Sequence, residues 1–149
     1  MSSNGIIRNL NVNKLNTQQI YLNTKNKITM GYSYNKKIDS NNNNIEIYPI
    51  VYPNTLDNMD DYILVLQQRT HTTFNPHKVQ LLYTITNLKT EAILTFNNIL
   101  DVDTCNGKIL ANSSNFYIIS GTGLFENCKL VNIQYKGDKY NSRIIEIFI

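Results

Sequence analysis

Apolar and polar residues alternate with a period of two along most of the chain. Apolar side chains fall on Ile28, Met30, Tyr32 and Tyr34, and the residues between them are polar or glycine. Because successive side chains of a strand point to opposite faces of a sheet, this alternation predicts a strand with one buried face. The same alternation predicts strands at 78–86, 91–97, 129–136 and 145–149.

Weaker segments complete the expected sheet. Short strands are predicted at 19–23, 44–48 and 116–119, and the continuous apolar run at 62–66 is typical of a strand covered on both faces. No window of eleven or more residues fits an amphipathic helix, and at most a helical turn or two is expected around 55–60. Many short strands separated by turns predict a single all-β domain over residues 1–149, closed as one antiparallel barrel of about eight strands. Residues 1–15 are either an opening strand or an arm used in assembly.

Glycine positions indicate where the chain reverses. Gly137-Asp138 lies between two strand-like runs and predicts a tight hairpin turn. Gly121 and Gly123 flank Thr122, so either glycine can take a positive φ and the chain can turn sharply between two strands. Phe125 can then fold back to plug one end of the barrel. A glycine-rich phosphate site would need a helix after this turn, whereas a strand pattern follows.

The second half of the chain carries an ordered set of motifs. A strand at 91–96 is followed by an acidic turn region, an Asn-Gly turn with a short apolar strand at 106–111, and an apolar strand at 116–119 that leads into Ser-Gly-Thr-Gly-Leu-Phe. This order, over about residues 82–149, resembles the barrel superfamily of plant dirigent proteins and allene oxide cyclases. Ser120 replaces the first glycine of the family's Gly-Gly-Thr-Gly run, and Glu126, Asn127 and Lys129 replace the arginine-rich step and second glycine that usually follow.

The resemblance implies a fold and a mode of action. Such barrels have eight antiparallel strands, are commonly homotrimers, and have an apolar cavity that opens at one end. The cavity holds a reactive intermediate so that one ring closure or coupling geometry wins, and a few polar residues at the mouth assist. The Asp-Pro signature that the dirigent proteins carry near their first strands is missing from this chain.

Composition limits the kinds of binding partner and the cellular compartments that we expect for this protein. The 149 residues carry a formal net charge of +3 with scattered lysines, so no nucleic-acid partner is predicted. No apolar run approaches the about 20 residues of a membrane span, and no secretory signal is visible, which predicts a cytoplasmic protein without a membrane partner. The asparagine-rich, alanine-poor composition is typical of an AT-rich genome, such as that of a large DNA virus, so a virion location stays open. Cys105 and Cys128 lack metal-ligand spacing, so we expect no metal and no other cofactor. One disulfide between them is possible, and two free thiols in a reducing compartment are the simpler expectation.

Candidate catalytic residues are few. Arg69 and His71 precede a loop that ends at His77, and they either face the cavity as acid–base or anion-binding groups or are exposed polar residues. Asp61 ends an acidic cluster with Asp57 and Asp60, for which a cavity-mouth carboxylate and a helix cap or solvated turn are the alternatives. No Ser-His-Asp or Cys-His arrangement can be argued from the sequence.

Three aromatic residues are candidates for the interior of the barrel. Tyr83, Phe96 and Phe125 are the candidates for lining a ligand cavity, with an ordinary aromatic core as the alternative. The function predicted is that of a non-catalytic or auxiliary barrel, used as a structural or interaction module of a homo-oligomer. The alternative is a dirigent- or cyclase-like barrel that binds a small apolar intermediate and directs its coupling or cyclisation by steric control. An open cavity with converging polar groups would favour the alternative, and a solidly packed barrel the first prediction.

Overall fold

The computed structural model describes residues 26–38, 44–50 and 61–149. Eight strands and two single-turn 3-10 helices make up most of this part: β1 (Lys27–Ser33), η1 (Tyr34–Lys36), β2 (Ile45–Pro49), β3 (Tyr62–His71), β4 (His77–Asn87), β5 (Ile93–Val102), β6 (Ser113–Gly121), η3 (Gly123–Phe125), β7 (Leu130–Tyr135) and β8 (Ser142–Phe148). No helix among these residues is long and apolar enough to cross a membrane. Three predicted segments lie outside the described residues: 1–15, an opening strand or an arm; 19–23, a strand; and 55–60, a helical turn or two.

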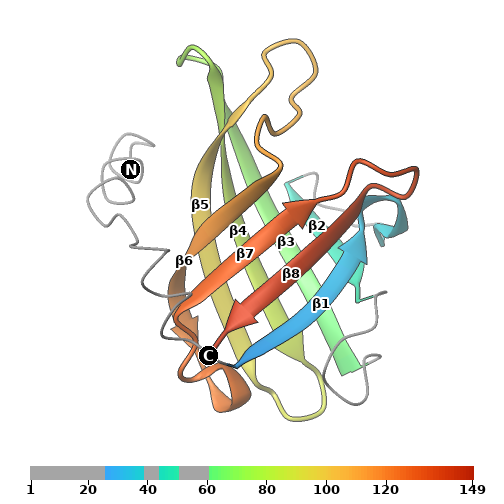
Figure 1. Cartoon of the computed structure of the whole chain (residues 1–149), viewed down its shortest axis with the longest axis vertical. Helices are drawn as coiled ribbons and strands as arrows, with labels where there is room; N and C mark the ends of the chain where they lie inside the picture. The colour runs from blue at the N-terminus through green and yellow to red at the C-terminus, as the bar shows by residue number, and fades with distance from the viewer. Residues whose placement is uncertain (1–25, 39–43, 51–60) are drawn as a thin grey trace.

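All eight strands belong to one antiparallel sheet that curls into a nearly closed barrel (Figure 1). From β2 to β8 each strand pairs with the next in the sequence, and β1 returns to pair with β8. The predicted all-β antiparallel barrel of eight strands is therefore confirmed.

Side chains, more than backbone hydrogen bonds, close the seam between β1 and β2. One isolated bridge joins Ile38 to Ile47. The rings of Tyr32 and Tyr48 pack with their centroids 4.8 Å apart. Aromatic burial thus stabilises an edge that backbone pairing covers at a single point.

The period-two pattern correctly identifies the inward faces. Val79, Leu81, Tyr83 and Ile85 of β4 are buried, and the polar residues between them are partly exposed. The apolar run at the start of β3 differs from its prediction. Leu64 and Leu66 are buried there, whereas Ile63 and Val65 are only partly so, so this strand has one fully covered face rather than two. The reason is architectural, because a curled antiparallel sheet has its core on one side only.

The lower half of the barrel is packed with aromatic rings. Tyr83 stacks on Phe96 with 5.1 Å between ring centroids, and the edge of Phe116 meets both rings at 5.3 and 5.4 Å. All three side chains are fully buried. This cluster fills the interior between the closed end of the barrel and its middle.

The glycine-flanked turn forms the closed end. Thr122 exchanges two hydrogen bonds with Ile93: its backbone N–H donates to the Ile93 carbonyl, and its Oγ1 accepts from the Ile93 N–H. A Cβ at Gly121 would lie 2.2 Å from the Phe125 carbonyl oxygen, and Gly123 has φ +56°. The missing side chains thus let η3 fold back and bury Phe125 completely.

Longer connections surround the other, open end of the barrel. Residues 136–141 join β7 to β8, so the hairpin predicted at Gly137-Asp138 exists but its turn is longer than the tight one expected. The Asp138 carboxylate accepts from the backbone N–H groups of Tyr140 and Ser142 and from the Ser142 hydroxyl. Because these bonds favour the ionised form, they lower the pKa of Asp138. The Asp138 side chain therefore stabilises this longer connection, which lacks the hydrogen bonding of a two-residue turn.

Candidate functional site

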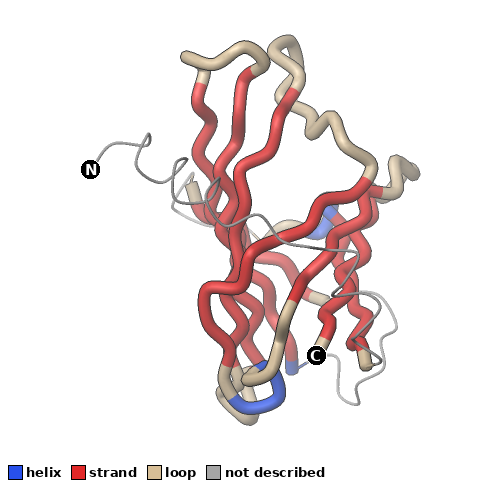
Figure 2. The backbone as a smooth tube through the Cα atoms, turned by 60° about the vertical axis from the view of Figure 1, so that its left-hand side comes forward, coloured by secondary structure: helices blue, strands red, loops and turns tan. Residues whose placement is uncertain are grey.

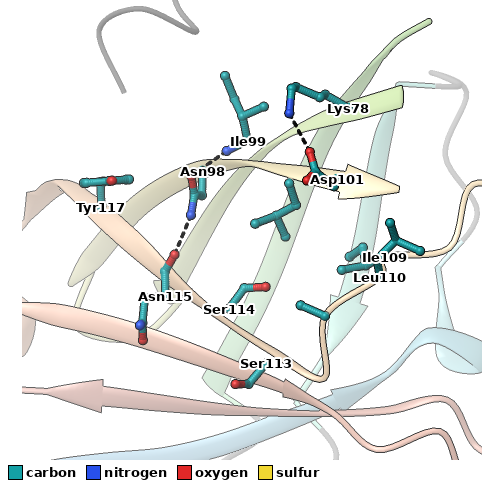
Figure 3. Close-up of a pocket in the computed structure, with 12 residues that line it drawn as sticks. Lys78, Asn98, Ile99, Asp101, Ile109, Leu110, Ser113, Ser114, Asn115 and Tyr117 are labelled. Carbon is teal, nitrogen blue, oxygen red and sulfur yellow. Dashed lines mark hydrogen bonds and ion pairs between the residues drawn. The ribbon is translucent and has the colours of Figure 1, made fainter. Parts of the chain in front are cut away.

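The wall of the barrel divides between β5 and β6. The two strands pair only along residues 94–97 of β5, opposite 117–121 of β6, with a register shift after Thr95. Beyond that point β5 continues to Val102 paired with β4 but not with β6, while residues 113–116 of β6 pair with β7. The amide of Asn98 donates to the Asn115 carbonyl at 2.6 Å and holds the strands together where they part (Figure 3). We call the resulting space of about 730 Å³ between β5 and β6 the wall pocket.

A second space, of about 480 Å³, lies inside the open end of the barrel, and we call it the mouth cavity. Its apolar walls include Leu66, Val79 and Leu81 of β3 and β4. Residues 106–112 of the β5–β6 connection also line it, and within them Ile109, Leu110 and Ala111 line the wall pocket too. This short segment is therefore the partition between the two spaces; Figure 2 shows the connection crossing the open end.

Two tyrosines from opposite sides of the barrel line the inner part of the mouth cavity. The hydroxyls of Tyr32 and Tyr83 are 3.2 Å apart and hydrogen-bonded, and each residue is only 1% exposed. Burial raises the pKa of both phenols, so both are neutral hydrogen-bond donors at physiological pH. Their mutual bond uses one hydroxyl proton and leaves the other available.

Two more buried hydroxyl groups lie close together, one beside each space. Tyr135 of β7 lines the mouth cavity, and Ser114 of β6 lines the wall pocket. Both oxygens are buried, and neither has a hydrogen-bond partner among the described residues. Burial raises the pKa of Tyr135, although the nearby Ser114 hydroxyl acts in the opposite direction. Buried hydroxyls without partners are rare because leaving one unpaired costs about 1–3 kcal/mol.

A cationic side chain faces this cluster. Arg143 lies opposite Tyr32 on β1 and Tyr135 on β7, in phase with the inward-facing residues of β8. Its guanidinium carbon is 5.4 Å from the centroid of the Tyr34 ring and 5.1 Å from that of Tyr135. These cation–π contacts hold the group at the mouth of the cavity. Within the described part of the chain, no carboxylate lies within ion-pair distance of it.

A buried carboxylate at the seam between β1 and β2 is engaged by neighbouring side chains. Glu46 is 8% exposed and accepts hydrogen bonds from Tyr34, Tyr48 and Gln68 at 3.3, 3.1 and 2.8 Å. Lys37 adds a longer ion pair at 3.9 Å. Burial and this carboxylate both raise the pKa of Tyr48. Glu46 therefore joins the two edges of the sheet and does not line the mouth cavity.

The cavity residues expected from the sequence occupy different parts of the barrel. Tyr83 lines the mouth cavity. Phe96 lies behind the Tyr83 ring in the packed core, and Phe125 fills the closed end. Neither phenylalanine lines the wall pocket or the mouth cavity. Two of the three expected ligand contacts are therefore core residues in the structure.

The candidate catalytic residues lie away from both spaces. Gln68 and Thr70 of β3 line the mouth cavity, and Arg69 and His71 alternate with them on the outer face. Arg69 is exposed, and an imidazole nitrogen of His71 contacts the Gln80 side chain. Asp61 directly precedes β3 at the closed end, where its carbonyl accepts from the Leu88 N–H at 2.7 Å. The structure brings none of these three candidates to the cavity.

The residues that do face the cavity were missed for identifiable reasons. Arg143 alternates in phase with Ile145 and Ile147, so a cation on an inward face was readable from the pattern. Tyr32 and Tyr135 were read only as positions on alternating strands. Their convergence depends on the pairing of β1 with β8, which links residues more than a hundred positions apart.

The described residues offer no cluster for a metal ion. No three histidine, cysteine, aspartate or glutamate side chains gather within them. Cys105 and Cys128 are both free, as expected. Burial raises the pKa of the Cys128 thiol to about 11, so it is protonated and unreactive at neutral pH.

The fold and the site define a nearly closed antiparallel β-barrel with a tyrosine-rich cavity at its open end. Comparisons with models of protein families, with curated proteins and with solved structures found no match to this chain. The resemblance to the dirigent and allene oxide cyclase superfamily stays a prediction.

Proposed function

We propose that this protein binds a small molecule in the mouth cavity. The observation that carries the proposal is the cavity itself: about 480 Å³ of space with Leu66, Val79 and Leu81 on its apolar side and with tyrosine hydroxyls and one guanidinium among its polar groups. Small-molecule sites typically have volumes of roughly 300–1,000 Å³ and combine apolar linings with a few directed polar groups. The buried Tyr135 hydroxyl, which has no partner in the geometry of the described residues, also favours an occupant that can bond to it.

The chemistry of the lining favours binding and orientation. Tyr32, Tyr83 and Tyr135 have raised pKa values, so at neutral pH they donate hydrogen bonds and do not abstract protons. A cavity with such walls could also hold a reactive intermediate in one geometry, which would require that the intermediate first binds there. The homotrimer, the interaction module and the virion location stay predictions.

A matched pair of variants tests whether binding takes place in the mouth cavity. Thr70 lines it near the rim, and an indole in Thr70→Trp would occupy the opening. Gln67 is exposed on the outer face of the same strand, so Gln67→Trp adds the same group outside. The neutral fluorescent probe N-phenyl-1-naphthylamine should bind wild type and Gln67→Trp with the same saturable increase in emission.

Thr70→Trp should weaken binding of this probe about tenfold or more, because a filled site loses the apolar contacts that hold the ligand. Equal binding to Thr70→Trp and Gln67→Trp would place the probe elsewhere and contradict the proposal. Absence of saturable binding, by this probe and by an aromatic carboxylate alike, would contradict it as well. Far-ultraviolet circular dichroism of all three proteins checks that the barrel is intact.

A further inference from the structure

Hydroxyl groups in and beside the mouth cavity have protons that the described residues leave unused. The Tyr32–Tyr83 pair leaves one hydroxyl proton unused, and the hydroxyls of Tyr135 and Ser114 have no partner among the described residues. Even a bond between Tyr135 and Ser114 would leave one of their two protons free. An occupant with acceptor atoms can satisfy these protons.

The guanidinium at the mouth is oriented with one edge free. The hydrogen bonds that Arg143 makes within the described residues both leave from Nη1, to the carbonyls of Asn141 and Ser142. The flanking rings of Tyr34 and Tyr135 fix the plane of the group. Among the described residues, the edge formed by Nε and Nη2 has no hydrogen-bond partner. Two parallel N–H donors on such an edge match the two oxygens of a carboxylate.

The surrounding charges favour an anion at this position. Lys108 lines the same cavity and adds a second positive charge at the mouth. Glu46, across the Tyr34 ring, is engaged by three hydrogen bonds and by Lys37 and does not line the cavity. A cationic ligand would be repelled by the charges of Arg143 and Lys108, whereas an anion would be attracted by them.

We propose that the molecule bound in the mouth cavity carries a carboxylate on a flat apolar body. This inference rests on the proposed function. The carboxylate is held on the Nε–Nη2 edge of Arg143 and accepts a hydrogen bond from Tyr135. The apolar body packs on Leu66, Val79 and Leu81.

Two probes of the same shape isolate the contribution of the charge. Isothermal titration calorimetry of wild type with 2-naphthoate and with neutral 2-naphthalenemethanol should give a Kd about tenfold or more lower for the carboxylate, because hydrogen bonds to a charged group are the stronger ones. Arg143→Gln should remove this preference and leave the neutral probe within about twofold of wild type. Arg69→Gln, which deletes an exposed arginine on the outer face, is the matched control and should change neither Kd.

Two conservative variants separate recognition from a structural role. Arg143→Lys keeps the charge without the paired donors and should recover part of the preference lost in Arg143→Gln. Tyr135→Phe should weaken 2-naphthoate by roughly threefold and 2-naphthalenemethanol by less, because a neutral hydroxyl is the weaker acceptor.

The outcomes distinguish this inference from the proposed function. Equal affinity of wild type for both probes, or an unchanged preference in Arg143→Gln, would overturn the carboxylate assignment and leave the binding cavity standing. Binding of neither probe would overturn both. Should Arg143→Gln fail to fold, the comparison of the two probes on wild type still decides.

Discussion

The hydroxyl of Tyr32 lies 3.2 Å from the hydroxyl of Tyr83, although the two residues belong to strands that do not pair with each other. The bond crosses the interior of the barrel from β1 to β4. It also marks a boundary. Below it, the rings of Phe96 and Phe116 fill the space, and above it the mouth cavity begins.

The first prediction concerns this hydrogen bond. Tyr32→Phe and Tyr83→Phe should each lower the free energy of unfolding by about 1 kcal/mol, because each leaves the partner hydroxyl buried without its bond. The double variant should cost less than the sum of the two, by about 0.5–1.5 kcal/mol, since no orphaned hydroxyl then remains. Urea denaturation of the four proteins measures this coupling. Tyr140→Phe, at an exposed position, is the control and should change the free energy of unfolding by less than about 0.5 kcal/mol. If the losses in Tyr32→Phe and Tyr83→Phe simply add up in the double variant, the two hydroxyls are not hydrogen-bonded.

The second prediction concerns alkaline pH. Burial raises the pKa of Tyr32, Tyr48, Tyr83 and Tyr135 in the folded protein. These raised pKa values do not affect the free energy of unfolding below about pH 10, where tyrosine in an unfolded chain begins to ionise. Above that pH the unfolded chain loses phenol protons that the folded protein still holds, so the free energy of unfolding falls as the pH rises towards the pKa values of the folded state. The ultraviolet absorbance of tyrosinate should therefore show a late group of phenols that ionise together with loss of the fold.

In the Tyr83→Phe variant this late group should be smaller by one phenol. Tyr140→Phe should leave it unchanged, because that ring is exposed in the native protein. A native protein in which every tyrosine ionised reversibly near pH 10 would be incompatible with the buried hydroxyls.

The third prediction concerns the plug at the closed end. Phe125 is fully buried and meets the edge of Tyr62 with ring centroids 6.4 Å apart. Phe125→Ala should lower the free energy of unfolding by about 3–5 kcal/mol through lost burial and the cavity that remains. Its neighbour Leu124 is 47% exposed, so Leu124→Ala should cost less than about 1 kcal/mol. Similar losses in the two variants, measured by thermal or urea unfolding, would count against a plugged barrel.

The fourth prediction concerns the close approach at Gly121. Gly121→Ala would place a Cβ against the Phe125 carbonyl, where only a backbone shift can relieve the overlap, and should cost about 1–3 kcal/mol. Gly107→Ala offers a contrast, because nothing lies within 4 Å of its added Cβ and the cost arises only from φ +71°. That backbone conformation costs a residue other than glycine about 1 kcal/mol. A milder effect at Gly121 than at Gly107 would mean that η3 does not pack as described.

The strands could be predicted because their signal is local. The alternation around Met30 and Leu81 depends on neighbours two residues apart, and it identifies which face turns inward whatever the strand pairs with. The prediction for residues 62–66 was wrong because an uninterrupted apolar run fits two kinds of strand. One is buried on both faces, and the other is buried on one face with outer residues that are only partly covered. Composition alone does not separate these cases.

The site was harder to predict because it arises from the places where regular pairing ends. The wall pocket exists because β5 and β6 part after Asn97, next to a register shift that no residue pattern marks. The mouth cavity depends on a connection, residues 106–112, that makes a single bridge at Ile109 where the resemblance implied a strand. Arg143 was the one readable signal, a charge in phase with buried isoleucines.

The pairing of β1 with β8 has a consequence for how the chain acquires its fold. Strands β2 to β8 form a meander in which each hairpin can assemble as soon as its second strand leaves the ribosome. Strand β1 is synthesised before all of them, yet its partner residues follow only at Ser142–Phe148. Pairing of β1 is therefore the last contact of the sheet that the growing chain can complete, and it closes the longest loop in sequence of any strand pair.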